Sequence, residues 1–188
     1  LKFLICNFDF CTLDFDFSMS LKLYNFFIRK IEVFKPINPP DVSLYTCGPT
    51  VYDFVHIGNW RTYIFEDILR RILEVNGYRV KHVENITDVD DKIIKGMREK
   101  GLGISEFIEP YEEAFFEDLE KLNLKKAHFY PKATQHTKEM IDLINRLMAK
   151  GFAYKSEDGI YFDISKFPNY GKLSNLVKRE QKVRARVA

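Results

Sequence analysis

The apolar residues of this chain fall into short runs and into longer stretches with helical spacing. Val42 to Cys47 forms a short apolar run after the Pro39-Pro40 break, and Val80 to Ile86 forms a second run. Between them, residues 61–76 place isoleucine, leucine and phenylalanine at every third or fourth position, with Gly77 where a helix would end. A strand, a helix and a strand at this spacing predict a right-handed βαβ unit with parallel strands.

The second half of the chain predicts three more helices and a hairpin. Acidic residues followed by a one-sided apolar stripe predict a helix over residues 88–100, and similar stripes predict helices over 105–124 and 137–150. The short apolar runs 152–154 and 160–164 flank an Asp-Gly pair, which is typical of a tight hairpin turn. The pattern therefore predicts an α/β fold. Its few predicted strands, against five or six in a doubly wound sheet, indicate an incomplete sheet.

Composition restricts the class of protein without identifying it. Of 188 residues, 46% are hydrophobic and 30% are charged, and the formal net charge is +2, so overall charge gives no argument for nucleic-acid binding. No uninterrupted apolar stretch of about 18 residues occurs, which argues against a transmembrane helix and a membrane partner. The three cysteines, Cys6, Cys11 and Cys47, do not form the framework of a secreted disulfide protein, so we expect a cytoplasmic location. We expect the basic segment 178–186 to be a solvated tail rather than an RNA contact.

The beginning of the chain differs in character from the rest. Residues 1–18 are rich in phenylalanine, are interrupted by aspartates and lack the pattern of a signal peptide. Because the first methionine is Met19, we expect the protein to start there, with residues 1–18 as a non-native or disordered leader.

The densest group of chemically useful side chains lies in the loop that follows the first predicted strand. Ligands bind α/β sheets at the carboxyl ends of the strands, and this loop supplies a thiol, hydroxyls, an imidazole and a glycine. His56 and Asn59 can donate hydrogen bonds to phosphate oxygens, next to a helix start whose N–H groups also favour anions. Gly58 would let a nucleotide approach the backbone closely. These residues predict a nucleotide site.

The segment HIGN at 56–59 resembles the His-Ile-Gly-His signature of class I aminoacyl-tRNA synthetases. Its surroundings, CGPTVYDFVHIGNWRTY, and a second block, NITDVDDKIIK, are similar to the cysteinyl-tRNA synthetase family, as are SLKLYNFFIRKIEVFKPI, PKATQH and YGKLS. The resemblance covers residues 19–188. It implies the N-terminal half of a Rossmann-like class I catalytic domain with a parallel sheet at 19–124, and the start of a connective insertion, a helix plus a β-hairpin, at 125–188.

On the amino-acid side, the resemblance implies a zinc ion that binds the thiol of substrate cysteine. Cys47 matches a zinc ligand of the family, and the positions around the substrate cysteine match Cys47, Gly48, Thr50 and Thr87. A thiophilic ion with an open coordination position would favour cysteine over serine, whose oxygen is harder and less acidic. The remaining ligands of the family, a Cys, a His and a Glu, would follow Ala188. Without the resemblance, Cys47 would be interpreted as a buried small apolar residue.

On the nucleotide side, the resemblance implies ATP with Mg²⁺ as a substrate. His56 and Asn59 match the catalytic pair that contacts ATP, and the implied ATP site consists of Thr50, His56, Gly58 and Asn59. Asn59 replaces the second histidine of the nominal signature, so it keeps a hydrogen-bond donor but cannot carry a charge. We expect its contribution to the transition state to be weaker.

Other polar residues of the chain are interpreted as structural. The aspartates, Asp88, Asp90 and Asp91, suit a helix start and local hydrogen bonding. The histidines, His82, His128 and His136, are not expected to bind zinc.

The implied reaction has two steps: adenylation of L-cysteine by ATP and transfer of the cysteinyl group to tRNA(Cys). The Lys-Met-Ser-Lys-Ser loop of such enzymes does not occur in this sequence, so we expect an N-terminal fragment, inactive alone, of a monomeric enzyme. Two alternatives stay open. One is a ligase that joins cysteine to an aminosugar–inositol in mycothiol synthesis, and the other is a non-catalytic nucleotide- or RNA-binding module.

Overall fold

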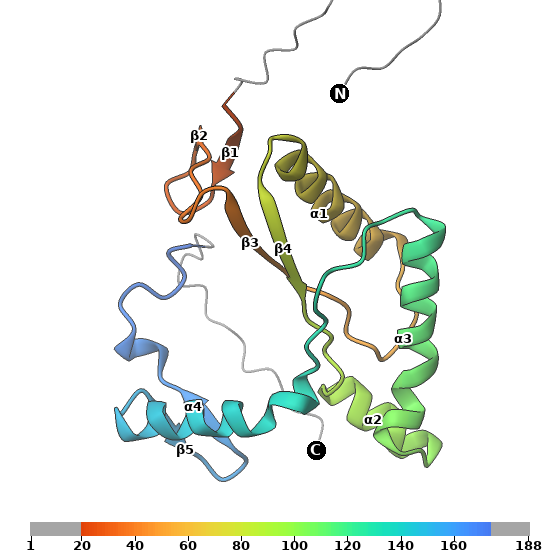
Figure 1. Ribbon diagram of the computed structural model, residues 1–188. Helices are drawn as coiled ribbons and strands as arrows, with labels where there is room; N and C mark the ends of the chain where they lie inside the picture. Colours follow the sequence, from red (N-terminus) through yellow and green to blue (C-terminus); the bar gives the residue numbers. More distant parts are fainter. Residues whose placement is uncertain (1–19, 174–188) are drawn as a thin grey trace, which may run out of the picture.

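The computed structural model describes residues 20–173, and its centre is a parallel βαβ unit. β3 (Asp41–Thr46) pairs in parallel with β4 (Arg79–Glu84) over the length of both strands. The connection between them is α1 (Ile57–Val75), which packs along β4 (Figure 1). The predicted strand–helix–strand order with parallel strands is confirmed, although α1 begins at Ile57 rather than at Arg61.

A third extended segment lies parallel to β4 on the side away from β3. The N–H of Glu84 donates to the carbonyl of Phe129 (3.0 Å), and the N–H of Ile86 donates to the carbonyl of Pro131 (2.9 Å). The sheet therefore runs from β3 through β4 to residues 128–133. The periodicity did not predict this segment, because its sequence, HFYPKA, has no alternation of apolar and polar residues.

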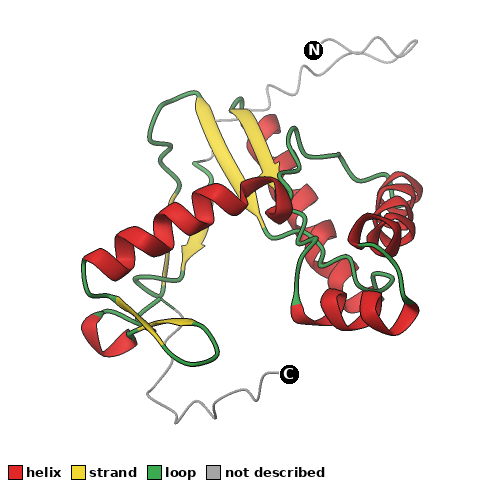
Figure 2. Ribbon diagram, turned by 90° about the horizontal axis from the view of Figure 1, so that it is seen from below, coloured by secondary structure: helices red, strands yellow, loops and turns green. Residues whose placement is uncertain are grey.

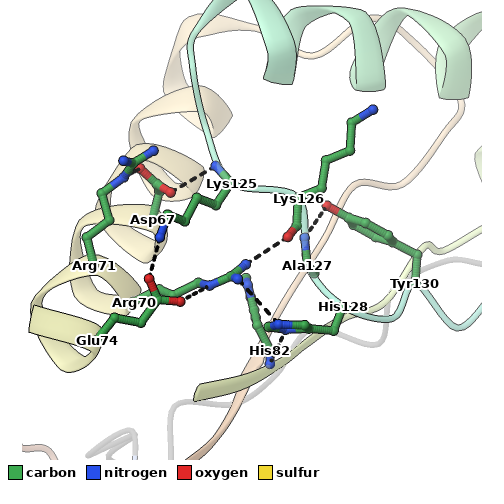
Figure 3. Close-up of polar contacts among 10 residues, drawn as sticks. All are labelled: Asp67, Arg70, Arg71, Glu74, His82, Lys125, Lys126, Ala127, His128 and Tyr130. Atoms are coloured by element: carbon green, nitrogen blue, oxygen red, sulfur yellow. Dashed lines mark hydrogen bonds and ion pairs between the residues drawn. The ribbon is translucent and has the colours of Figure 1, made fainter. Parts of the chain in front are cut away.

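Buried polar contacts attach the third segment to α1 and β4 (Figure 3). Arg70 on α1 is 8% exposed and donates to Glu74 Oε1 (2.9 Å) and to the carbonyl of Lys126 (2.7 Å). The N–H of His82 donates to Nδ1 of His128 (3.0 Å). A neutral ring that accepts at Nδ1 carries its proton on Nε2, so Arg70 Nη2, 3.4 Å away, faces another donor and makes no hydrogen bond there.

The remaining elements agree with the predicted order of helices and hairpin. After β4 these are α2 (Asp91–Lys100), α3 (Ile104–Lys121), the 3₁₀ turn η1 (Ala133–His136), α4 (Thr137–Ala149), β5 (Ala153–Lys155), β6 (Ile160–Phe162) and the 3₁₀ turn η2 (Ile164–Lys166). β5 and β6 form the predicted antiparallel hairpin. In Figure 2, α4 and this hairpin lie apart from α2 and α3. An earlier hairpin, β1 (Lys22–Asn25) with β2 (Lys30–Val33), was not predicted.

Two apolar clusters hold the helices to the carboxyl ends of the parallel strands. The first joins the loops after β3 and β4 to α2 and α3, and it contains Val51, Ile86, Ile93, Phe107 and Ile108. The second joins α1 to α3, and it contains Trp60, Tyr63, Phe115 and Leu119. The core thus fixes the edge of the sheet at which α/β proteins bind ligands. No residue of α4 is buried.

Several predictions lie outside the described residues: the leader at 1–18 with Cys6 and Cys11, and the basic tail at 178–186. The division of the chain at residues 124 and 125 stays a prediction, while the pairing of 128–133 with β4 extends the parallel sheet beyond it. Within residues 20–173, no helix is both long enough and apolar enough to cross a membrane.

Candidate functional site

A pocket of about 460 Å³ opens where the loop after β3 meets the start of α1. Its lining includes most of the predicted site residues, namely Cys47, Gly48, Thr50, His56 and Asn59. Gly58 and Thr87 do not line it. Thr87 lies behind the wall, where it forms a parallel bridge with Thr50 and its N–H donates to the carbonyl of Pro49 (2.9 Å).

Gly48 allows the ends of β3 and β4 to approach each other closely. A Cβ atom at this position would lie 2.0 Å from the carbonyl oxygen of Asn85 and 2.9 Å from Cγ of Glu84. No side chain therefore fits at position 48. The preceding Cys47 is exposed, with its sulfur 3.8 Å from the carbonyl oxygen of Gly48. This exposure argues against Cys47 as a buried apolar residue and leaves the thiol accessible from the pocket.

His56 forms the N-terminal cap of α1. Its Nδ1 accepts the N–H of Gly58 (3.0 Å), and its carbonyl accepts the N–H of Asn59 (2.9 Å). This cap explains why α1 starts at Ile57: the first turn is stabilised by a side chain and not by apolar burial. A neutral imidazole that accepts at Nδ1 has its proton on Nε2, so the outer nitrogen of His56 is a donor.

The cap changes two details of the expected nucleotide site. The N–H groups of Gly58 and Asn59, which were expected to bind phosphate, are already bonded to His56. A Cβ atom on Gly58 would lie 2.8 Å from Cε1 of His56, so glycine here makes room for the imidazole ring. Between residues 56 and 59, the side chains of His56 and Asn59 keep donors for a ligand.

Some of the lining residues were not predicted from the sequence. Thr62 and Tyr63 lie one helical turn after Asn59 and line the same pocket, so helical spacing could have identified them. Lys92 reaches the pocket from α2, and its Nζ lies 3.0 Å from the hydroxyl of Tyr52 and 4.2 Å from the centre of that ring. Only the tertiary fold brings Lys92 to this place.

A carboxyl group on α1, Glu66, interacts electrostatically with a carboxyl group on β4, Glu84. Glu84 is 4% exposed, and its Oε1 has no hydrogen-bond partner within residues 20–173. Burial, and then the charge of Glu66, raise the pKa of Glu84 to about 7. Burial also raises the pKa of Glu66 to about 7, although the hydroxyl of Thr46 donates to it and acts in the opposite direction. Burial and these two carboxyls raise the pKa of Tyr63, so its hydroxyl stays protonated.

His82 is linked to this carboxyl pair through Thr46. Its Nε2 lies 2.8 Å from Oγ1 of Thr46, the residue before Cys47. Burial, and then the charge of Arg70, lower the pKa of His82 to about 4, so the ring is neutral near pH 7. Since the hydroxyl of Thr46 donates to Glu66, the Nε2–H of His82 donates to Thr46.

The aspartates after β4 have two different roles. Asp90 caps α2 by accepting the N–H of Lys92 (2.9 Å), and Asp91 lies in the first turn, as expected for a helix start. Asp88 differs from the expectation. It is 2% exposed and accepts both the N–H (2.9 Å) and the hydroxyl of Thr134, which ties the loop after β4 to the segment after residue 133.

Comparison with known proteins agrees with this geometry. Residues 33–188 match the family described as the tRNA synthetases class I (C) catalytic domain. The chain belongs to this family. The class I synthetase chain is 54% identical over 161 residues to a cysteine–tRNA ligase of Brachyspira hyodysenteriae, which covers 86% of the chain and 34% of that protein. It is 54% identical over 170 residues to one of Chlamydia trachomatis, with 90% and 35% covered. For one of Methanococcus maripaludis the identity is 53% over 156 residues, with 83% and 33% covered.

These matches confirm the predicted fold class, an α/β class I synthetase catalytic domain with a parallel sheet. The class I synthetase chain spans about a third of the length of these curated relatives. No group of three or more His, Cys, Asp or Glu side chains able to hold a metal ion occurs within residues 20–173.

Proposed function

We propose that this chain supplies the nucleotide-binding and cysteine-recognising part of a cysteine–tRNA ligase. The observation that carries the proposal is one pocket that gathers the exposed thiol of Cys47 with the donors of His56 and Asn59. The names of the relatives agree with it. In such an enzyme, the carboxylate of L-cysteine reacts with ATP, bound with Mg²⁺, to give cysteinyl-adenylate and pyrophosphate, and the cysteinyl group then passes to the terminal ribose of tRNA(Cys) with release of AMP.

On the nucleotide side, side chains rather than backbone amides hold the phosphates. The Nε2–H of His56 and the amide of Asn59 donate to phosphate oxygens, beside Thr50 in the same lining. Negative charge builds up around the α-phosphorus when the cysteine carboxylate attacks it. Donors that are already in place stabilise this charge without reorganisation. The bond from Gly58 to Nδ1 fixes the His56 ring and its tautomer in advance.

On the amino-acid side, Cys47 would supply one thiolate ligand of a zinc ion, and Gly48 and Thr50 would surround the substrate cysteine, with Thr87 supporting them from behind the lining through its bridge to Thr50. The exposed thiol at the end of β3 fits a ligand role, and the other ligands come from outside residues 20–173. A bound zinc ion would supply selectivity for a thiol over a hydroxyl. The missing side chain of Gly48 keeps the end of β4 close to this thiol.

The proposal also covers the ligands, the oligomeric state and the cellular location of the parent enzyme. The ligands are tRNA(Cys), L-cysteine and ATP, the parent enzyme is a cytoplasmic monomer without a membrane partner, and the isolated 188-residue chain does not activate cysteine. Residues 19–124 belong to the catalytic domain and residues 125–188 to the connective insertion.

A chimera tests this function. The chain replaces the matching third of the Brachyspira hyodysenteriae cysteine–tRNA ligase, to which it is 54% identical over 161 residues. We expect the chimera to bind zinc and to charge tRNA(Cys), and Cys47→Ala to abolish both. Ser43→Ala, on the exposed face of the same strand, is the matched control and should change neither.

The same chimera separates the alternatives. Charging of tRNA(Cys) that is as fast with Cys47→Ala as without it would refute the role of the thiol. Consumption of cysteine that depends on an aminosugar–inositol would favour the mycothiol ligase. ATP binding without release of pyrophosphate would favour a non-catalytic module.

A further inference from the structure

Asp88 is buried more deeply than any other polar side chain of residues 20–173, yet it does not line the candidate pocket. One oxygen of its carboxylate accepts the N–H of Thr134 (2.9 Å), and the other accepts the hydroxyl of the same residue. A buried carboxylate without hydrogen bonds is unstable, so these two bonds keep Asp88 in its place. Both oxygens are thus engaged by protein groups rather than directed at a ligand.

Asp88 ends a segment that supports the pocket wall from behind. The N–H of the preceding Thr87 donates to the carbonyl of Pro49 (2.9 Å), and the carbonyl of Thr87 accepts the N–H of Val51 (3.2 Å). Thr50 lies between these two bonds, and both Pro49 and Thr50 line the pocket. The position of this wall therefore follows the position of Thr87.

The same segment is held on its other side by residues that precede α4. The N–H of Ile86 donates to the carbonyl of Pro131, and the carbonyl of Ile86 accepts the N–H of Ala133 (3.2 Å). Two residues further along, the side chain of Asp88 continues this contact by binding Thr134. The wall, the segment 86–88 and residues 131–134 thus form three layers, and Asp88 joins the second layer to the third.

Thr134 also lies at the start of α4. It belongs to η1, and its carbonyl accepts the hydroxyl of Thr137, the first residue of α4 (3.0 Å). Since no residue of α4 is buried, this helix has no core contact of its own that would hold its start. The pair of Asp88 and Thr134 therefore connects the start of α4 with the pocket wall.

We propose that Asp88 is a positioning residue for the amino-acid side of the pocket. By holding Thr134 it fixes Thr87, and through Thr87 it fixes the wall at Pro49 and Thr50 against which the substrate lies. That this substrate is cysteine rests on the proposed function. Loss of Asp88 should weaken the binding of cysteine more than that of ATP, because the proposed ATP donors lie at the start of α1 and are fixed by its cap.

Hydrogen exchange of the 188-residue chain tests the positioning itself. Asp88→Ala leaves the N–H and the hydroxyl of Thr134 without an acceptor. The segment then opens more often, and the N–H groups of Thr87 and Val51 should exchange about tenfold faster. Thr134→Val keeps the volume and the N–H bond but loses the hydroxyl, so a smaller increase is expected. Thr134→Ser keeps both bonds and should restore the slow exchange.

Asp67→Ala is the matched control. Asp67 is also a buried aspartate that binds the chain after α3: it accepts the N–H of Lys125 (2.9 Å) and a side-chain donor, Nε of Arg71 (2.6 Å). The control therefore removes the same kinds of contact at a place that does not support the pocket wall. It should leave the exchange of the Thr87 and Val51 amides unchanged.

The chimera with the Brachyspira hyodysenteriae ligase supplies the second measurement, cysteine-dependent ATP–pyrophosphate exchange. Asp88→Ala should raise the KM for cysteine about tenfold, since a small displacement of a binding wall costs at least this much. The KM for ATP should stay within about twofold. Thr134→Val should raise the KM for cysteine less, and Thr134→Ser and Asp67→Ala should leave it unchanged.

Faster exchange and a higher KM for cysteine in Asp88→Ala, but not in Asp67→Ala, support the proposal. Unchanged exchange of the Thr87 and Val51 amides would overturn it, whatever the kinetics. Equal effects of both variants, or an equal rise in KM for both substrates, would mean a general loss of structure and would also overturn it. Where Asp88→Ala does not fold, Thr134→Val and Thr134→Ser decide by the same criteria. If exchange changes as expected but the unaltered chimera does not activate cysteine, the proposed function fails while the positioning of the wall stands.

Discussion

At the scale of single residues, His56 has two roles that substitutions can separate. It caps α1 through Nδ1, and we propose that its Nε2–H contacts phosphate. His56→Asn keeps a side-chain oxygen that can cap a helix, so the free energy of unfolding should stay within about 0.5 kcal/mol, while ATP affinity falls. His56→Ala should lose both the cap, at a cost of about 1 kcal/mol, and the affinity. Urea unfolding and ATP titration measure the two effects. Unchanged ATP affinity in His56→Asn would show that the imidazole does not contact the nucleotide.

The buried carboxyl group of Glu84 makes the free energy of unfolding depend on pH. The direction of this dependence follows from the effect of burial on its pKa. Its pKa is raised from 4.5 to about 7 in the folded state by burial and by Glu66, and it returns to 4.5 in the unfolded chain. The folded state therefore holds more protons between these values. This contribution to stability is complete below pH 4.5 and is lost as the pH rises through about 7.

Glu84→Gln should remove much of this dependence, because a neutral amide of the same shape has no charge to desolvate. We expect the unaltered chain to be less stable at about pH 8 than at about pH 5, and Glu84→Gln to show a smaller decline. Urea unfolding at both pH values measures it. Glu117→Gln, on the exposed side of α3, is the control. A decline in Glu84→Gln as steep as in the unaltered chain would contradict the prediction.

At the scale of elements, the third segment of the sheet depends on Arg70. Replacing this residue by methionine leaves the carbonyl of Lys126 and Oε1 of Glu74 without the Arg70 donor, while Lys125 still donates to the other oxygen of Glu74. Such a loss in a partly buried setting costs about 1–2 kcal/mol. The N–H groups of Glu84 and Ile86 should also exchange faster, because they donate to carbonyls of residues 128–133. Urea unfolding and hydrogen exchange test this, with the exposed Arg98→Met as control. Unchanged exchange at both amides would show that other contacts hold the segment.

The sequence predicts elements whose pattern is local and misses those that depend on distant partners. The apolar stripe predicted α1, but its first turn was missed because Ile57 is 83% exposed and adds nothing to the stripe. Residues 128–133 lack strand alternation and are held by β4, far away in the sequence. At the site, the loop after β3 was identified from its residue types. Lys92 and the pair of Glu66 and Glu84 were not, because only folding brings them to the pocket or buries them.

At the scale of the whole molecule, the strand pair is covered on one face only within residues 20–173. α1 covers the face that carries Val42, His82 and Glu84, whereas Tyr45 on the opposite face is 67% exposed. β3 also has no strand partner on its outer side in the described part of the chain. Parallel sheets normally have both faces covered, and unpaired strand edges promote association. We therefore expect the 188-residue chain alone to self-associate.

Tyr45→Lys should weaken this self-association, because a lysine places charge on the open face and beside the unpaired edge of β3. Tyr154→Lys is the matched control: it makes the same exchange at a residue that is 53% exposed, on β5 and away from β3. Sedimentation velocity at two concentrations tenfold apart should show a concentration-dependent increase in mass for the unaltered chain and for Tyr154→Lys, and a smaller increase for Tyr45→Lys. Equal weakening by both lysines would assign the association to apolar exposure in general, and an unaltered chain that stays monomeric at both concentrations would contradict the role of the open face.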